Sequence, residues 1–110
     1  MKRVRIDQAA AELSTNPIMV GDVFVQTLTE GSQQIRVAAV SFPNGSRNVF
    51  HTHDSEQVLY IVEGEGIVAT EDEELWVSAG DVVTIPAGEK HWHGARPDTS
   101  MVHLAIMLVG

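Results

Sequence analysis

Short apolar segments separated by turn-forming residues run through most of the chain and predict β-strands. The separators are rich in glycine, proline, asparagine and acidic residues, as in Pro43-Asn44-Gly45 and Ala79-Gly80-Asp81. Only residues 7–14 favour a short helical turn, which Asn16-Pro17 would end. The predicted strands cover 24–28, 35–42, 49–53, 57–62, 67–70, 75–77, 82–85 and 101–109, with 63–66 and 71–74 as turns. This pattern predicts an all-β sandwich or barrel that forms one domain over residues 1–110.

Two of these segments, 35–42 and 101–109, are apolar on both faces. In the last one, alternate positions place His103, Ala105, Met107 and Val109 opposite Val102, Leu104, Ile106 and Leu108. A half-exposed strand would alternate apolar with polar residues, so both faces must be covered. One face can line a barrel interior, and the other needs a second sheet or a partner subunit. We expect a homodimer that buries the face of Val102, with the N-terminal segment able to cross over.

Composition and charge narrow the classes of partner. The chain has 110 residues and no cysteine, so disulfides and thiolate metal ligands are excluded. Fifteen acidic and seven basic residues give a formal charge of −8, which disfavours nucleic acid and anionic membranes as partners. No apolar segment approaches the roughly 20 residues of a membrane span, and no apolar signal core follows the basic N-terminus. We therefore expect a cytoplasmic protein with a small-molecule substrate.

Four of the five histidines form two His-x-His pairs, His51-Thr52-His53 and His91-Trp92-His93, and the fifth is His103. On a β-strand, side chains at i and i+2 point to the same face, about 7 Å apart. Two imidazoles at this spacing can converge on one metal ion. Both pairs lie beside strand-like sequence, so the pattern indicates a metal site rather than scattered surface histidines.

The glycines, the proline and the histidines around these pairs resemble the two conserved motifs of the cupin superfamily. The first runs from Gly45 through His51, His53 and Gln57 to Gly64, and the second runs from Gly80 through Pro86 and Gly88 to His91. The resemblance implies an antiparallel jelly-roll β-barrel with a metal inside it. It also implies that the ligands are His51, His53, Gln57 and His91.

Gln57 stands where most metal-binding cupins have a glutamate. Glu56 does not replace it, because a shift of one residue turns a side chain to the opposite face of a strand. Three imidazoles and an amide oxygen are neutral, so a bound divalent ion keeps its full charge and becomes a stronger Lewis acid. A neutral ligand set also binds the metal more weakly. It stabilises the higher oxidation state of iron less, which disfavours redox cycling. Nitrogen and oxygen donors suit manganese or iron first, with nickel, cobalt and zinc as alternatives.

A narrower resemblance is to bacterial cupins that include manganese-dependent hydroxynitrile lyases, which cleave cyanohydrins to an aldehyde and hydrogen cyanide. It is carried by His51-Thr52-His53 with Gln57, by the segment 88–95, and by 99–106. It implies that His103, with His93 as a second candidate, moves a proton. It also implies that Ala38 and Val40, together with Met107 on the face of His103, line the pocket.

We expect a metal-dependent lyase or isomerase that acts on a small oxygen-bearing substrate, and two alternatives stay open from the sequence. One is an oxygen-activating, metal-dependent dioxygenase of the quercetinase-like kind, which Gln57 disfavours. The other is a small-molecule binding module without turnover, in which His93 and His103 are hydrogen-bonded core residues.

Overall fold

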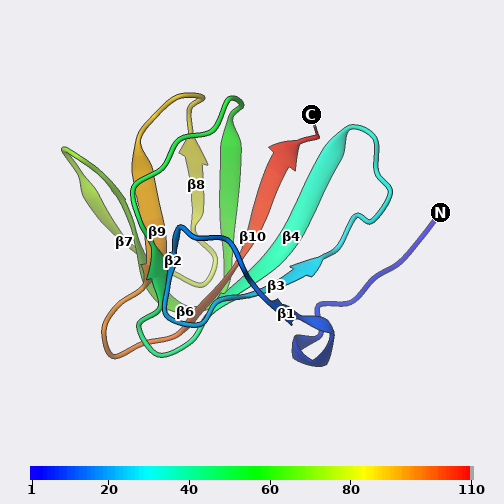
Figure 1. Cartoon of the computed structure of the whole chain (residues 1–110), viewed down its shortest axis with the longest axis horizontal. Helices are drawn as coiled ribbons and strands as arrows, with labels where there is room; N and C mark the ends of the chain where they lie inside the picture. The colour runs from blue at the N-terminus through cyan, green and yellow to red at the C-terminus, as the bar shows by residue number, and fades with distance from the viewer. Residues whose placement is uncertain (110) are drawn as a thin grey trace.

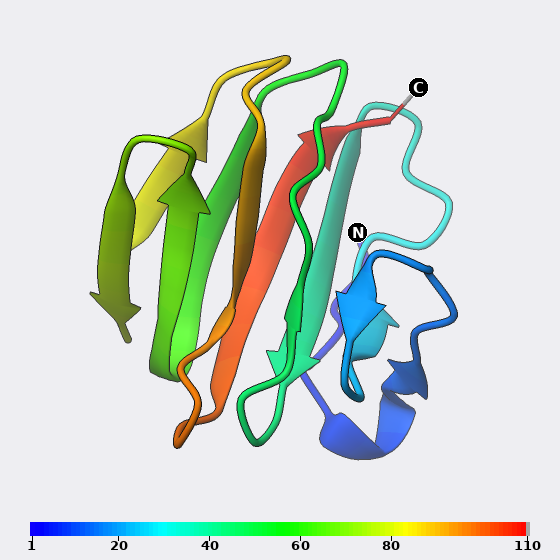
Figure 2. The same ribbon diagram turned by 60° about the vertical axis from the view of Figure 1, so that its left-hand side comes forward.

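The strands pair antiparallel into one curled sheet that folds around a central core, as Figures 1 and 2 show. The computed structural model describes residues 1–109. These residues form a 3-10 helix η1 (Gln8–Ala10) and the strands β1 (Glu12–Leu13), β2 (Met19–Val20), β3 (Phe24–Thr27), β4 (Ile35–Phe42), β5 (Arg47–Asn48), β6 (Gln57–Thr70), β7 (Glu74–Ser78), β8 (Val82–Ile85), β9 (His91–Ala95) and β10 (Met101–Leu108). The all-β, jelly-roll fold predicted from the sequence is confirmed.

The long strand β6 joins two layers of the fold. Its first half pairs with β10 and β8, and its second half pairs with β7 and β9. Beyond β10 the sheet goes on through β4, then β3, then β1. Beyond β9, on the other side of β6, it goes on through β5 and then β2. Figure 2 shows β9 and the segment after β5 lying in front of β10 and β4. The space between these two layers holds the core and the inward-facing polar side chains.

The turn predicted over residues 63–66 is wrong, because the chain stays extended there as the middle of β6. Gly64 has a φ of 80°, and a side chain there would collide with the Ser100 carbonyl oxygen. A side chain at Gly66 would collide with the Gly94 carbonyl oxygen and with Met101. Glycine at these positions lets the strand bend and pass close to its neighbours without ending.

Two other local predictions need correction. The helical turn expected over 7–14 is only η1, and Glu12–Leu13 instead pairs with β3. The strand expected over 49–53 is replaced by the short β5 at Arg47–Asn48 and by an isolated bridge between His51 and His91. Strand β2 was not predicted. In each case long-range pairing, rather than local periodicity, selects the backbone conformation.

The core contains the inward-facing side chains of the central strands. Phe42, Leu59 and Ile61 are fully buried. Around them pack residues of β3, β4, β6, β7, β8 and β10: Val25, Ala38, Val40, Val68, Val77, Val83, Ile85, Met101 and Ala105. The alternation of β4, β6 and β10 therefore has the expected parity, with Gln57, Leu59 and Ile61 all buried on one face.

The outer face of β4, β10 and the first half of β6 is apolar and only partly covered. The N-terminal segment lies against one side of it, where the Gln26 side chain accepts from the Asp7 N–H and donates to the Arg5 carbonyl, both at 2.9 Å. Farther along, Ile35 and Leu108 are exposed. In the described part of the chain, no helix is long and apolar enough to cross a membrane.

Candidate metal centre

Four chain segments bring polar side chains to one cavity inside the fold. His51 and His53 lie between β5 and β6, Gln57 begins β6, His91 and His93 lie on β9, and His103 lies on β10. The cavity has a volume of about 810 Å³, which is within the usual range for a small-molecule site. All of these side chains except His91 are among its lining residues.

The imidazoles of the first histidine pair and of His91 form a tight group. The ring centroids are 4.4 Å apart for His51 and His91, 4.9 Å for His51 and His53, and 5.2 Å for His53 and His91. Nδ1 of His51 lies 2.7 Å from the Val49 carbonyl oxygen, and Nδ1 of His91 lies 2.8 Å from that of Glu89. These contacts place the proton on Nδ1 and leave Nε2 as a free lone pair, the arrangement that metal-binding histidines adopt.

Several buried nitrogen and oxygen atoms in this region have no hydrogen-bond partner in the described structure: Nε2 of His53, Nε2 of His91 and Oε1 of Gln57. An unpaired buried acceptor costs about 1–3 kcal/mol. A divalent cation would satisfy all three at once, since imidazole nitrogen and amide oxygen are both suitable ligands. The donor set of His51, His53, Gln57 and His91 therefore fits a metal ion.

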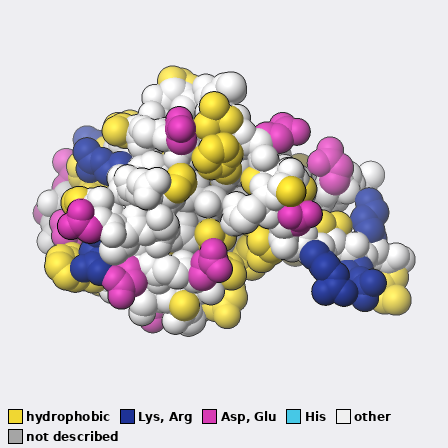
Figure 3. Space-filling view, turned by 90° about the horizontal axis from the view of Figure 1, so that it is seen from below, with side chains coloured by type: hydrophobic (Ala, Val, Ile, Leu, Met, Phe, Trp, Pro, Cys, Tyr) yellow, Lys and Arg dark blue, Asp and Glu magenta, His cyan; other side chains and the backbone are white. Residues whose placement is uncertain are grey.

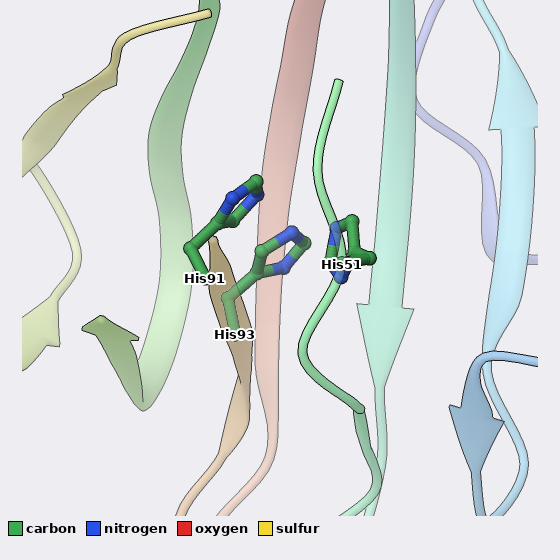
Figure 4. A group of neighbouring side chains, drawn as sticks. All are labelled: His51, His91 and His93. Carbon is green, nitrogen blue, oxygen red and sulfur yellow. The ribbon is translucent and has the colours of Figure 1, made fainter. Parts of the chain in front are cut away.

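A second, overlapping triad is formed by His51, His91 and His93, whose ligating nitrogens all lie within 4.8 Å of one another. Figure 4 shows His91 and His93 projecting from β9 toward His51. This three-histidine cluster also has the spacing to hold a metal ion, so the region offers two overlapping ligand sets. Nδ1 of His93 is already 3.0 Å from Nε2 of His103, whereas Nε2 of His53 has no partner. This difference favours His53 over His93 as the third imidazole ligand.

The Gln57 amide is oriented by a neighbour on β10. Its Nε2 donates to the Met107 sulfur at 3.4 Å, and the residue is buried. Because the amide nitrogen turns toward Met107, Oε1 is left on the opposite side of the group. A thioether is a weak acceptor, so this contact guides the amide without fixing it.

His93 and His103 form a buried pair next to the three imidazoles. Besides the 3.0 Å contact between their rings, the Asn48 side chain holds His93. Asn48 Oδ1 accepts the His93 backbone N–H at 2.8 Å, and its Nδ2 lies 3.4 Å from His93 Nε2. Asn48 did not emerge from the sequence, because a single asparagine carries no pattern that reveals burial.

Burial favours the neutral form of the inner histidines. It lowers the pKa of His103 to about 4. Burial, followed by repulsion from His103 and His51, lowers the pKa of His93 well below its ordinary value. Burial is also the main cause of the lowered pKa values of His53 and His91. Neutral imidazoles keep lone pairs available both for a metal and for accepting protons.

The cavity wall is built from alternating residues of β4 and β10. Ala38 and Val40 line it, as do Ala105 and Met107. The structure thus places the sequence-predicted pocket residues Ala38, Val40 and Met107 around the same cavity as the histidines. It adds the segment Glu12–Met19 and Arg36, which sequence reasoning missed. The parity of Arg36 with Ala38 was a usable signal, but an arginine at a strand end is ordinarily solvent-exposed.

The family of the chain follows from its sequence and fold together. A family model described as the cupin domain matches residues 38–107. The chain belongs to the cupin family. A cupin-like protein of Thermotoga maritima superposes with a TM-score of 0.83 at 30% identity, covering 97% of this chain and 78% of that one. The polyketide cyclase RemF of Streptomyces resistomycificus, at 22% identity, shares the fold with a TM-score of 0.88 over 98% of this chain and 79% of its own.

Curated relatives include proteins with different activities. The (R)-mandelonitrile lyase of Granulicella tundricola is 47% identical over 70 residues, which are 63% of this chain and 53% of the lyase. An acireductone dioxygenase of Parasynechococcus marenigrum is 37% identical over 65 residues, 53% of this chain and 35% of the enzyme. The match therefore spans about half or less of these relatives, and the family by itself does not select a reaction.

Proposed function

We propose that this cupin is a metal-dependent lyase that cleaves a cyanohydrin to an aldehyde and hydrogen cyanide. The observation that carries the proposal is the arrangement of two groups in one cavity. Neutral nitrogen and oxygen atoms that can bind a metal, and that lack hydrogen-bond partners, lie beside a buried pair of histidines, His93 and His103. These two histidines can exchange a proton. The mandelonitrile lyase that is 47% identical over 70 residues supports the choice of reaction.

We assign the metal to His51, His53, Gln57 and His91, and manganese is the ion we expect. A bound divalent ion would act as a Lewis acid toward the substrate oxygen and stabilise negative charge on it. Each of the four residues contributes a neutral donor atom, so no protein carboxylate in the set offsets the charge of the ion. Gln57 presents its amide oxygen because Met107 accepts from its nitrogen.

The proton transfers fall to the His93–His103 pair. One neutral imidazole accepts the proton of the cyanohydrin hydroxyl as the oxygen–carbon double bond forms. The carbon–carbon bond to the nitrile breaks, and its electron pair leaves with cyanide. The imidazolium then returns the same proton to cyanide, which departs as hydrogen cyanide. The 3.0 Å contact lets the two rings share the proton between these steps.

Small apolar side chains form part of the cavity wall. Ala38, Val40 and Ala105 are short apolar side chains, and they leave room beside the polar cluster for one ring or a short chain.

The test is cleavage of mandelonitrile by protein loaded with manganese, measured by the appearance of benzaldehyde and of cyanide. We expect turnover by the loaded protein, none above background after chelation, and recovery when manganese is returned. A fully loaded sample that neither cleaves mandelonitrile nor forms it from benzaldehyde and cyanide would contradict the lyase assignment.

A dioxygenase is the second candidate, supported by similarity to an acireductone dioxygenase at 37% identity over 65 residues. The neutral Gln57 ligand argues against it, because a carboxylate ligand would better stabilise the higher oxidation state of iron. An oxygen electrode separates the two candidates. Iron-loaded protein that consumes oxygen with an enediol substrate, together with inactivity on mandelonitrile, would favour the dioxygenase.

A further inference from the structure

Arg36 lies on the inner face of β4, two residues before Ala38 and four before Val40. All three line the cavity, as the alternation of a β-strand requires. Arg36 is exposed, in contrast to the two buried residues that follow it. The guanidinium therefore belongs to the open end of the cavity, where it can meet an entering molecule.

The register of the sheet sets Arg36 level with the proposed metal ligand Gln57. On β10, Met107 is the partner of Arg36 on one side and of Gln57 on the other. Three strands side by side separate the outer two Cα atoms by about 10 Å. One small molecule can thus place one end beside the Gln57 amide oxygen and the other end beside Arg36.

Arg36 has no carboxylate partner among the described residues. The two recorded ion pairs join Lys90 to Glu71 and Arg96 to Glu65. Glu12 also lines the cavity, but it pairs with Val25, and Val25 pairs with Val40. Val40 lies four positions along β4 from Arg36, a distance of about 13 Å. Glu12 therefore does not neutralise Arg36.

The charge of the site also favours an anion. The proposed ligands are three imidazoles and one amide, none of which carries a negative charge. Among the described lining residues, the one carboxylate is Glu12 and the one permanent cation is Arg36. With a divalent ion bound, the cavity is positive, although the whole chain has a formal charge of −8.

We propose that Arg36 selects substrates that carry a carboxylate at the end remote from the reacting oxygen. The proposal rests on the function assigned above, because that function defines the reacting end. A guanidinium offers two parallel N–H donors that match the two oxygens of a carboxylate. An exposed ion pair is weak in water, but a ligand that fills the mouth of the cavity shields this one.

The experiment compares two probes that differ in one charge, 4-formylbenzoate and 4-formylbenzamide. Their affinities for manganese-loaded protein are measured by calorimetry, without turnover. We expect the wild-type protein to bind the carboxylate about tenfold more tightly than the amide, equivalent to about 1.4 kcal/mol. R36Q should abolish this preference. R36K, which keeps the charge but lacks the planar fork, should retain about a threefold preference.

The matched control is Arg3→Gln, which removes the same charge from the exposed N-terminal segment outside the cavity. It should keep the tenfold preference. Failure of the wild-type protein to prefer the carboxylate, or to bind either probe at millimolar concentration, would overturn the proposal. An unchanged preference in R36Q would overturn it too.

The outcome is separable from that of the lyase assignment. Loss of the carboxylate preference in R36Q, in a protein that never cleaves mandelonitrile, would support the role of Arg36 and contradict the lyase. Cleavage of mandelonitrile by the wild-type protein, with the same probe preference in R36Q, would do the reverse.

Discussion

At the scale of single residues, the site depends on polar side chains that burial leaves with few alternative partners. His103 is fully buried, and one of its ring nitrogens, Nδ1, has no partner in the described structure. Its other nitrogen faces His93. A buried nitrogen without a hydrogen-bond partner lowers the stability of the fold. A role for His103 in proton transfer would account for its presence there.

The first prediction concerns His103→Ala. We expect turnover of mandelonitrile to fall by about 10²–10⁴-fold, the usual range for losing a general acid or base. Metal content should not change, because His103 is not in the proposed ligand set. Steady-state kinetics and elemental analysis of the same sample measure both. Equal loss of metal and activity would place His103 in the metal site instead.

The second prediction concerns Gln57→Glu. A carboxylate in place of the amide adds a negative charge to the ligand set, so manganese affinity should rise by at least about tenfold. Lyase turnover should fall, because the ion becomes a weaker Lewis acid. Competition with a chelator measures the first effect, and Gln57→Ala serves as the control that weakens binding. Unchanged affinity in the glutamate variant would remove Gln57 from the ligand set.

At the scale of elements, the proposed metal site lies where the segment after β5 pairs with β9. The bridge between His51 and His91 holds the two segments together through mutual backbone hydrogen bonds of 2.9 and 3.0 Å. This pairing explains why the first histidine pair converges with the second although it does not belong to a regular strand.

The third prediction distinguishes the two overlapping histidine sets. The double variant His51→Ala, His53→Ala should lose stoichiometric manganese, whereas His93→Gln should retain it. Elemental analysis after gel filtration gives the metal content, and circular dichroism verifies that each variant is folded. Loss of metal from His93→Gln, together with retention in a single His53→Ala variant, would assign the site to His51, His91 and His93.

The fourth prediction concerns acid stability of the metal-free protein. The pKa of His103 is about 4 when folded and 6.5 ordinarily, so the unfolded chain takes up the proton first as the pH falls. The contribution of His103 to stability is complete above about pH 6.5 and declines toward pH 4. Between pH 7 and pH 5 it should decrease by about 2 kcal/mol.

Urea unfolding at the two pH values tests this, with His103→Asn as the control. The asparagine does not titrate, so the variant should lose less stability than the wild-type protein over the same interval. An equal loss in both proteins would show that other groups account for the whole effect.

At the scale of the whole molecule, one apolar sheet face and the N-terminal segment are largely exposed to solvent. Tyr60, Val82 and Leu108 are 41%, 60% and 66% exposed on this outer face. Figure 3 shows the basic N-terminal segment projecting from a body that bears scattered acidic groups. Lys2, Arg3 and Arg5 lie there, whereas the chain as a whole has a formal charge of −8.

The fifth prediction is a homodimer that buries the face of Leu104 and Ile106. Sedimentation at micromolar concentration should give a species of twice 12.0 kDa. Ile106→Glu should shift it toward the monomer, because a charge in an apolar interface is costly. Leu75→Glu, at an exposed position on β7, is the matched control and should stay dimeric. A 12 kDa species of the unmodified protein would contradict the prediction.

The sequence alone determined those properties that follow from local spacing. Strand alternation placed Gln57, Leu59 and Ile61 on one inward face, and it put His103 with Ala105 and Met107. The interval between the two histidine pairs, with its glycines, identified the family. The face on which a side chain lies depends only on its position along its own strand. It can therefore be predicted without knowing which strands are neighbours.

Only the tertiary structure decided what depends on which strands are neighbours. It carried β6 through residues 63–66, where Gly64 and Gly66 press against β9 and the start of β10. It also brought the segment Glu12–Met19, Asn48 and Arg36 to the cavity. Strand register, and the burial of isolated polar residues such as Asn48, are set by segments far apart in the chain. They arise only when the sheet closes, so no local pattern of polar and apolar residues encodes them.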